Sequence, residues 1–168
     1  MGGVMTADRF QRQAELVPRS RINEITATVI GVGAVGRQIA LQLASIGSRN
    51  LQLIDFDRVE LTNVTTQGYR RDQIGQAKVE ATAADVKSID PEIEVSVIAD
   101  RYRPYFKTGE AVFACVDSIR ARAAIWRALQ SGCSLWIDGR MRGEVIRVLA
   151  SDDPTRDSYY SQSLFDPS

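Results

Sequence analysis

Residues 27–57 read ATVIGVGAVGRQIALQLASIGSRNLQLIDFD, and this stretch decides the fold. Its first apolar run, 27–31, predicts a strand, and the turn after it leads into a helix whose apolar residues are spaced for one face. A second strand is predicted at 51–55 and ends at Asp55, whose carboxylate is placed to accept hydrogen bonds from ribose hydroxyls. A strand, turn, helix and strand in this order predict a parallel βαβ unit.

The turn carries the pattern Gly-x-Gly-x-x-Gly at Gly31, Gly33 and Gly36. Glycine permits a sharp bend and lets a phosphate approach the backbone without a Cβ in the way. The helix that begins near Ala34 directs unpaired N–H groups and the positive end of its dipole toward that phosphate. We expect these residues to contact a bound nucleotide. The alternative is that the glycines only permit close packing of the helix against the strand.

The composition excludes several kinds of chemistry. Lys plus Arg and Asp plus Glu both number 21 among 168 residues, so no net charge favours nucleic acid or a membrane surface. The sequence has no histidine, which removes histidine bases, Ser-His and Cys-His pairs and ordinary zinc sites. No apolar run is long enough to span a membrane. Cys115 and Cys133 lie in apolar stretches, which favours buried, reduced thiols in a cytoplasmic protein.

The rest of the chain continues the alternation of strands and helices. This order favours an α/β fold of Rossmann type, which is a doubly wound, mostly parallel sheet with helices on both faces. We divide the chain into an N-terminal arm (1–26), a nucleotide-binding domain (27–150) and a polar tail (151–168). Helices are predicted at 8–16, 75–88 and 118–130, a long polar loop at 58–74, and further strands at 93–98, 111–116, 135–137 and 145–149.

The arm is predicted to be a helix with a tether. The helix begins with an N-cap type of residue and is ended by Pro18. Its apolar side would consist of Phe10, Ala14 and Leu16. Polar and helix-breaking residues then connect it to the first strand.

Polar residues gather at one edge of the predicted sheet. Ligands of open parallel sheets bind where the carboxyl ends of the strands meet. Beside the glycine turn, this edge would carry Asp57 and a loop that contributes Asn63, Gln67 and Lys78. The lysine offers a mobile point charge for a phosphate. For Asp57 and the nearby Glu60, the simpler interpretation is that they are solvated loop acids.

Asp117 follows the apolar strand predicted at 111–116. A carboxylate at that position is placed to hold Mg²⁺ against a triphosphate, because this ion takes one or two carboxylates together with phosphate oxygens. The alternative is that Asp117 caps the helix predicted from residue 118, and the two roles are compatible.

Five motifs of the chain resemble one known family. Their order and spacing are similar to those of the ThiF/HesA/MoeB adenylyltransferases, the bacterial relatives of ubiquitin-activating enzymes, over about residues 8–150. In that family, ATP adenylates the C-terminal glycine of a small β-grasp protein and pyrophosphate is released. The motifs are DRFQRQ (8–13), GVGAVG (31–36), LIDFDRVELTNV (53–64), GQAKVEA (75–81) and FACVDSIRAR (113–122).

The resemblance implies ATP and Mg²⁺ as cofactors, a ubiquitin-like or sulfur-carrier protein as substrate, and a homodimer. It implies that Asp55 binds the ribose, Asn63 and Lys78 the phosphates, and Asp117 the magnesium. Arg12 resembles the arginine that a partner subunit inserts against the γ-phosphate. The catalytic candidates are therefore Arg12, Lys78 and Asp117. Adenylation depends on positioning and charge neutralisation and needs no histidine.

The chain also departs from the family pattern. Thr66 stands where the family has an arginine, although Gln67 is retained, so one phosphate contact is missing unless Arg70 or Arg71 supplies it. There are no Cys-x-x-Cys pairs, so we expect no structural zinc. The segment with a thioester-forming cysteine is lacking, and apolar surroundings make Cys115 and Cys133 poor replacements. We expect a minimal or truncated adenylation domain.

Two alternatives stay open. The glycine turn and Asp55 also permit an NAD-binding oxidoreductase, although no substrate domain or proton donor is evident and the loop from Asn63 to Lys78 would have no purpose. A catalytically weak scaffold of the same fold is favoured by Thr66 and the short C-terminus.

Overall fold

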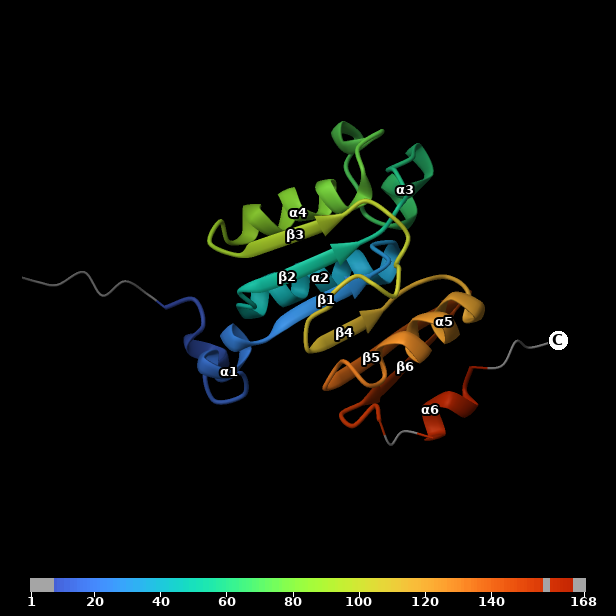
Figure 1. The fold of residues 1–168 in the computed structure, drawn as a ribbon. Helices are drawn as coiled ribbons and strands as arrows, with labels where there is room; N and C mark the ends of the chain where they lie inside the picture. The colour runs from blue at the N-terminus through green and yellow to red at the C-terminus, as the bar shows by residue number, and fades with distance from the viewer. Residues whose placement is uncertain (1–7, 156–157, 165–168) are drawn as a thin grey trace, which may run out of the picture.

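A six-stranded sheet forms the centre of the protein. The computed structural model describes residues 8–155 and 158–164. The strands are β1 (Thr26–Ile30), β2 (Asn50–Ile54), β3 (Glu94–Ile98), β4 (Ala111–Ala114), β5 (Leu135–Arg142) and β6 (Val145–Ser151). Their order in the sheet is β3-β2-β1-β4-β5-β6, and only β6 is antiparallel to its neighbour (Figure 1). The predicted doubly wound, mostly parallel fold is confirmed.

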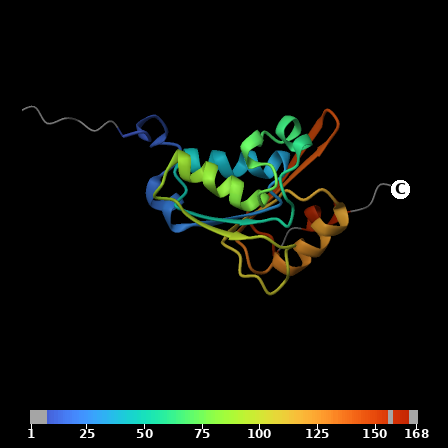
Figure 2. The same cartoon turned by 90° about the horizontal axis from the view of Figure 1, so that it is seen from above.

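Helices cover both faces of this sheet, as Figure 2 shows. One face carries α2 (Ala34–Ile46) and α4 (Lys78–Ile89), and the other carries α5 (Ile119–Leu129) and α6 (Ser158–Gln162). Successive strand residues point to opposite faces, so Val29 and Leu53 pack in the core under α2 and α4. Ile30 and Ile54 pack in the core under α5. Burial on both faces explains why most residues of these strands are apolar in the sequence, with the half-buried Gln52 of β2 as an exception.

The strand order creates a switch point beside β1. The chain first builds outward to β2 and β3, then crosses to β4 on the other side of β1. The turn after β1 and the exit of β4 are therefore neighbours. The amide of Gly31 donates to the Ile54 carbonyl and that of Cys115 donates to the Ile30 carbonyl, both at 2.8 Å. Open α/β sheets bind their ligands at such a point.

The predicted helix at 8–16 is wrong. The segment forms only a 3₁₀ turn, η1 (Gln11–Gln13), and a short helix, α1 (Arg19–Glu24), begins directly after Pro18. Phe10 is buried, but Leu16 is 86% exposed, so the expected apolar side does not exist. The Phe10 ring lies against Gly47, with the guanidinium groups of neighbouring arginines stacked on it. The anchored ring, together with hydrogen bonds from Arg9 and Gln13, holds the arm on the domain in place of a helix face.

The polar stretch 58–74 is more ordered than the predicted loop. It contains α3 (Leu61–Thr66) and a second 3₁₀ turn, η2 (Arg71–Gln73). Glu60 and Asn63 form a reciprocal capping box at the start of α3. A six-residue helix has too few turns to show an apolar period, which explains why the sequence pattern did not predict it.

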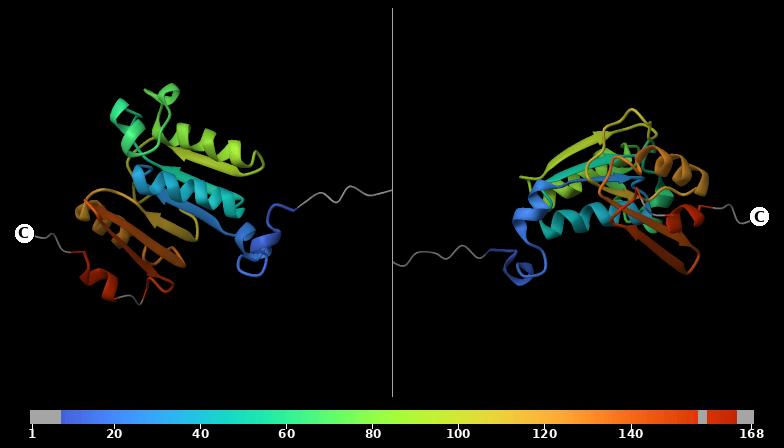
Figure 3. Two further views of the ribbon diagram at one scale, coloured as in Figure 1. Left: turned by 180° about the vertical axis from the view of Figure 1, so that it is seen from behind. Right: turned by 60° about the horizontal axis from the view of Figure 1, so that its bottom comes forward.

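The last elements close the far edge of the sheet. The β5–β6 hairpin lies at the opposite edge from β3, seen from behind in Figure 3. An apolar groove of about 490 Å³ lies between α2 and this hairpin, lined among others by Val35, Ile39, Met141 and Ile146. After the hairpin, α6 returns to the sheet and buries Tyr160. No helix in residues 8–155 and 158–164 has the length and apolar character needed to cross a membrane.

Candidate functional site

The glycines of the turn between β1 and α2 have different roles. Gly31 has a φ of 89°, and a Cβ there would lie 2.8 Å from the Cys115 carbonyl oxygen. A Cβ on Gly36 would lie 1.8 Å from the Gly31 carbonyl oxygen. Close packing alone therefore requires both glycines. At Gly33 the nearest atom to an added Cβ is a side-chain oxygen of Gln67 at 3.9 Å. Only Gly33 leaves backbone that a ligand can approach.

The first turn of α2 faces this open backbone. Gly33 is the N-cap residue, and it supplies no side-chain cap to the helix amides. The first turn carries no acidic residue either. Uncapped amides and the positive end of the helix dipole are the features that bind anions. Ala34 begins the helix at this point, as predicted.

Asp55 is buried at the exit of β2 and braces the turn from one side. Its Oδ2 accepts from the Val32 amide at 2.7 Å, and its Oδ1 accepts from the Asp57 amide at 2.8 Å. Each carboxylate oxygen has a further lone pair, so these bonds leave acceptor capacity for a hydroxyl group. The structure places Asp55 beside the glycine turn, as the sequence predicts.

Lys78 lies at the same edge but is held by an ion pair. Its Nζ lies 3.0 Å from Asp57 Oδ2, with the lysine side chain 8% and the aspartate side chain 46% exposed. Asn63 is buried at the start of α3, where its side-chain oxygen accepts from the Glu60 amide at 2.9 Å. Asp57 therefore has a defined partner and is not merely a solvated acid, whereas Glu60 is exposed and contacts Asn63 through its backbone amide.

Gln67 lies over the open side of the turn. Its side-chain oxygen is buried, contacts the Gly33 position and has no hydrogen-bond partner in the described part of the chain. Buried polar atoms are normally paired, so an unpaired one beside an open backbone fits a site that a ligand completes. ATP fits this turn because a partnerless polar atom, an uncapped helix start and a carboxylate converge there.

Asp117 is exposed just beyond β4. The alternative role as a helix cap is wrong, because Ser118 is the N-cap of α5 and its Oγ accepts from the Ala121 amide at 3.1 Å. Residues 8–155 and 158–164 contain no cluster of three or more His, Cys, Asp or Glu side chains suited to a metal. A single carboxylate such as Asp117 can hold Mg²⁺ only if phosphate oxygens supply the other ligands, as expected from the sequence.

Arg12 belongs to η1, and the N-terminal arm that contains η1 lies at the opposite end of α2 from the glycine turn (Figure 1). The neighbouring Gln13 donates to the Ile46 carbonyl at 2.6 Å, which fixes η1 at the C-terminal end of α2. A helix of 13 residues is about 20 Å long. Arg12 therefore does not belong to the site of its own chain.

Comparisons with known proteins identify the family of this chain. Residues 9–166 match the model of the ThiF family. The chain belongs to the ThiF family. It is similar to ubiquitin-like modifier-activating enzyme 5 of Caenorhabditis elegans (30% identity, 77% of this chain and 35% of that protein) and of Drosophila pseudoobscura pseudoobscura (33%, 77% and 37%). It thus spans about a third of the length of these curated relatives.

Solved structures share the fold. The E. coli tRNA N6-threonylcarbamoyladenosine dehydratase TcdA is 30% identical with a TM-score of 0.73, over 82% of this chain and 62% of that one. A second TcdA structure, in complex with AMP, is 29% identical with a TM-score of 0.71, over 82% and 60%. E. coli MccB is 18% identical with a TM-score of 0.76, over 88% and 46%, which shows a common fold alone.

Thr66 stands where the ThiF-family pattern has an arginine, and Arg70 does not replace that arginine. Thr66 faces solvent, and its hydroxyl donates to the Thr62 carbonyl within α3. The guanidinium of Arg70 is paired with Asp72 and Asp85, and Arg71 is exposed in η2. Two carboxylates thus engage Arg70, and the exposed Arg71 stays the candidate for this contact.

The cysteines of this ThiF-family chain are poorly suited to nucleophilic chemistry. Burial raises the pKa of Cys115 to about 12 and raises the pKa of Cys133 as well. Both thiols are free. A thiol that stays protonated at neutral pH is a weak nucleophile, as the apolar surroundings in the sequence suggested.

One buried charged cluster near the site was not found from the sequence. Asp138 at β5 is fully buried and pairs with Arg122 of α5 and with Arg140. Arg122 also donates to carbonyls at the end of β4, and the Tyr160 hydroxyl donates to Asp138 Oδ2 at 2.9 Å. The only sequence signal was a carboxylate directly after the apolar residues of β5. This cluster locks the exits of β4 and β5 together.

Proposed function

We propose that this chain is an ATP-dependent adenylation domain that acts on the C-terminal glycine of a ubiquitin-like or sulfur-carrier protein. The observation that carries this proposal is the open backbone at Gly33, which lies at the sheet switch point in front of an uncapped helix. The ThiF family match and the E1-like relatives support the reaction class. The two free cysteines support a cytoplasmic location.

Each candidate residue has a specific task in this proposal. The amides at the start of α2 bind the phosphates, and Asp55 accepts from the ribose hydroxyls. Asn63 directs its side-chain amide group at a phosphate oxygen. Lys78 exchanges Asp57 for the phosphates, which keeps its charge paired in both states. Asp117 holds Mg²⁺ together with phosphate oxygens.

The proposed reaction is a phosphoryl-type transfer. A carboxylate oxygen of the carrier bonds to the α-phosphorus of ATP, and the bond from that phosphorus to the pyrophosphate oxygen breaks. The carrier leaves as the acyl adenylate, and negative charge collects on the departing pyrophosphate. The cations around the triphosphate stabilise that charge, and no proton transfer to a histidine is required.

A homodimer is part of the proposal. The apolar groove along α2 extends between the glycine turn at one helix end and the contact with η1 at the other. Twofold pairing of two such grooves makes the two α2 helices antiparallel. The arm of one copy then lies beside the glycine turn of the other, and Arg12 reaches the partner's triphosphate. The guanidinium would neutralise charge on the leaving pyrophosphate.

ATP–pyrophosphate exchange with candidate carriers ending in Gly-Gly, run with Mg²⁺, tests the reaction. Calorimetric titration of ATP and of NAD tests the choice of nucleotide. Asp55→Asn should weaken ATP binding, because it removes the charge while one oxygen still accepts from the Val32 amide; its NH2 group no longer accepts from the Asp57 amide, so thermal unfolding is the folding control. Tight NAD binding without ATP binding would refute adenylation and favour the oxidoreductase alternative.

Asp117→Asn tests the metal, with the exposed Asp152→Asn as its control. We expect normal folding in both variants and a steep loss of exchange only in the first. Mixing Arg12→Ala with Asp117→Asn chains tests the shared site, because a mixed dimer contains one intact site. Between about a quarter and a half of the parent activity should return. No recovery despite proven subunit exchange would exclude a shared site.

A second candidate function is a nucleotide-binding scaffold without adenylation activity. The solvent-facing Thr66 and the pairing of Lys78 with Asp57 favour it, because two expected phosphate contacts are absent or occupied. ATP binding without any pyrophosphate exchange, for every carrier tested, would select this function.

A further inference from the structure

Two side chains hold the backbone of Val32, in the middle of the glycine turn: one binds its N–H group and the other binds its carbonyl group. Its amide donates to Asp55 Oδ2 at 2.7 Å. Its carbonyl accepts from the Tyr69 hydroxyl at 2.6 Å. Val32 is fully buried, so neither group has water as an alternative partner. The conformation of the turn therefore depends on where the Tyr69 hydroxyl is placed.

Tyr69 is itself fixed from several directions. The ring is buried, and the guanidinium of Arg37 lies 5.0 Å from its centroid. The hydroxyl is also 3.1 Å from the Thr82 hydroxyl on α4. Burial raises the pKa of Tyr69 to about 12, so the hydroxyl keeps its proton and remains a donor at neutral pH. The ring cannot rotate away without breaking contacts to two helices.

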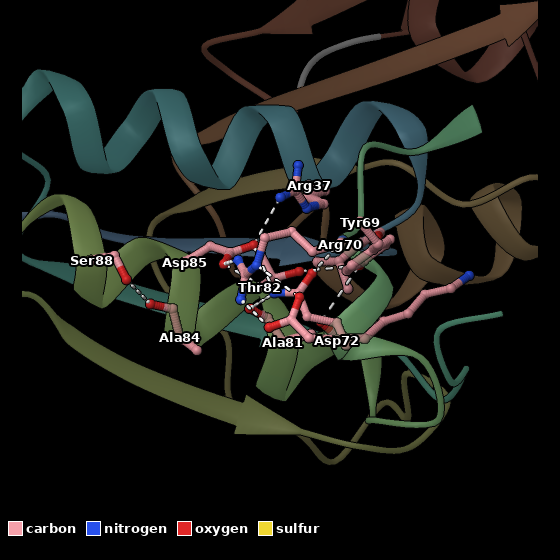
Figure 4. Close-up of polar contacts among 12 residues, drawn as sticks. Arg37, Tyr69, Arg70, Asp72, Ala81, Thr82, Ala84, Asp85 and Ser88 are labelled. Atoms are coloured by element: carbon pink, nitrogen blue, oxygen red, sulfur yellow. Dashed lines mark hydrogen bonds and ion pairs between the residues drawn. The ribbon is translucent and has the colours of Figure 1, made fainter. Parts of the chain in front are cut away.

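Asp85 on α4 holds this arrangement together (Figure 4). It accepts from Arg37 of α2 at 2.8 Å, from Gln73 at 3.0 and 3.1 Å, and from Arg70. Burial alone would raise the pKa of Asp85, but these hydrogen bonds outweigh it and keep the pKa below its ordinary value. One carboxylate thereby connects α2, α4 and the segment that carries Tyr69.

The geometry points to Tyr69 as a positioning residue for the nucleotide, with Arg37 and Asp85 as its support. The hydroxyl fixes the Val32 carbonyl, and so directs the Gly33 backbone and the first amides of α2 toward the phosphates. This inference rests on the proposed ATP site. The residues that carry it lie behind the turn, and none of them is expected to touch the nucleotide.

Tyr69→Phe tests the inference, because it keeps the ring under Arg37 and removes only the hydroxyl. Hydrogen exchange in the nucleotide-free protein should become about tenfold faster at the amides of Val32, Gly33 and Ala34. Exchange in β5 should not change. Where the parent binds Mg-ATP, the dissociation constant should rise by a similar factor of about ten. The exposed Tyr159→Phe is the matched control and should match the parent.

Thr82→Ala is a second variant that leaves the Tyr69–Val32 bond in place. It removes one support of the hydroxyl, so the same changes should appear in weaker form. Faster hydrogen exchange confined to the turn supports the inference even if the parent binds no ATP. A parent that binds no ATP would count against the proposed function alone. Unchanged exchange at the turn in both variants overturns the inference. Unchanged affinity in a parent that binds ATP overturns it too.

Discussion

Gly33→Ala and Gly36→Ala separate the two roles of the glycine turn. A Cβ at residue 36 would lie 1.8 Å from the Gly31 carbonyl oxygen, so α2 has to move away from β1. Overpacking of this kind costs about 3 kcal/mol or more, because the carbonyl that the Cβ meets is backbone and cannot turn aside as a side chain could. Alanine regains about 1 kcal/mol of helix propensity, which does not offset the clash. We expect the melting temperature to fall by roughly 4–8 °C.

At residue 33 the added Cβ meets nothing closer than 3.9 Å, so the melting temperature should stay within about 2 °C of the parent. The Cβ would occupy the surface where a phosphate approaches, and Mg-ATP affinity should fall at least about tenfold. Thermal unfolding and calorimetric titration of both variants measure these effects. A Gly36→Ala protein as stable as the parent would refute the packing argument. A Gly33→Ala protein with the ATP affinity of the parent would refute the proposal that a phosphate contacts the backbone at Gly33.

Three further predictions concern the buried groups. Asp138→Ala leaves Arg122 and Arg140 unpaired and should cost about 3–5 kcal/mol in urea denaturation, while a loss under 1 kcal/mol would contradict its role as a lock. Because the pKa of Cys115 is about 12 rather than 9, its alkylation at pH 8 should be on the order of 10³-fold slower in the folded than in the unfolded chain, and equal rates would disprove the shift. The pKa of Tyr69 is raised to about 12 in the folded chain, against 10 when unfolded. Its contribution to stability is therefore complete below pH 10 and is lost as the pH rises toward 12. Between pH 9 and pH 11, the urea midpoint should fall less in Tyr69→Phe than in the parent, and an equal fall would contradict the shift.

Much of the fold followed from hydrophobic patterning. β1 and β4 are largely buried on both faces and are therefore mostly apolar, β2 interrupts its apolar residues with the half-buried Gln52, and α2 and α5 carry apolar residues at helical spacing. The arm could not be predicted in this way, because the buried ring of Phe10 and hydrogen bonds from Arg9 and Gln13 hold it. α3 is likewise defined by its capping box rather than by any repeat. Local hydrogen bonds and single anchors leave no periodic trace in a sequence.

The candidate site shows the same division. The glycine turn follows β1 and Asp55 follows β2, and these two strands are adjacent in the sheet. The topology alone therefore brings the turn and Asp55 together. The contacts of Tyr69 with Val32 and Thr82 depend on side-chain directions across three segments. The pairing of Arg122 with Asp138 requires β4, β5 and α5 to be assembled first. Such contacts are decided by tertiary packing, and residue types at a given spacing do not predict them.

The aromatic cluster beneath α6 gives the protein a built-in optical probe. Trp126 and Trp136 are the only two tryptophans of the chain, and their rings lie 5.2 Å apart. Tyr160 packs 4.5 Å from the first ring and 5.5 Å from the second, and Trp126 donates to Ser161 at 3.1 Å. Release of α6 would expose both indoles to water together. Intrinsic fluorescence therefore reports the attachment of the C-terminal segment, and a red shift that precedes loss of secondary structure would identify its release as a separate step.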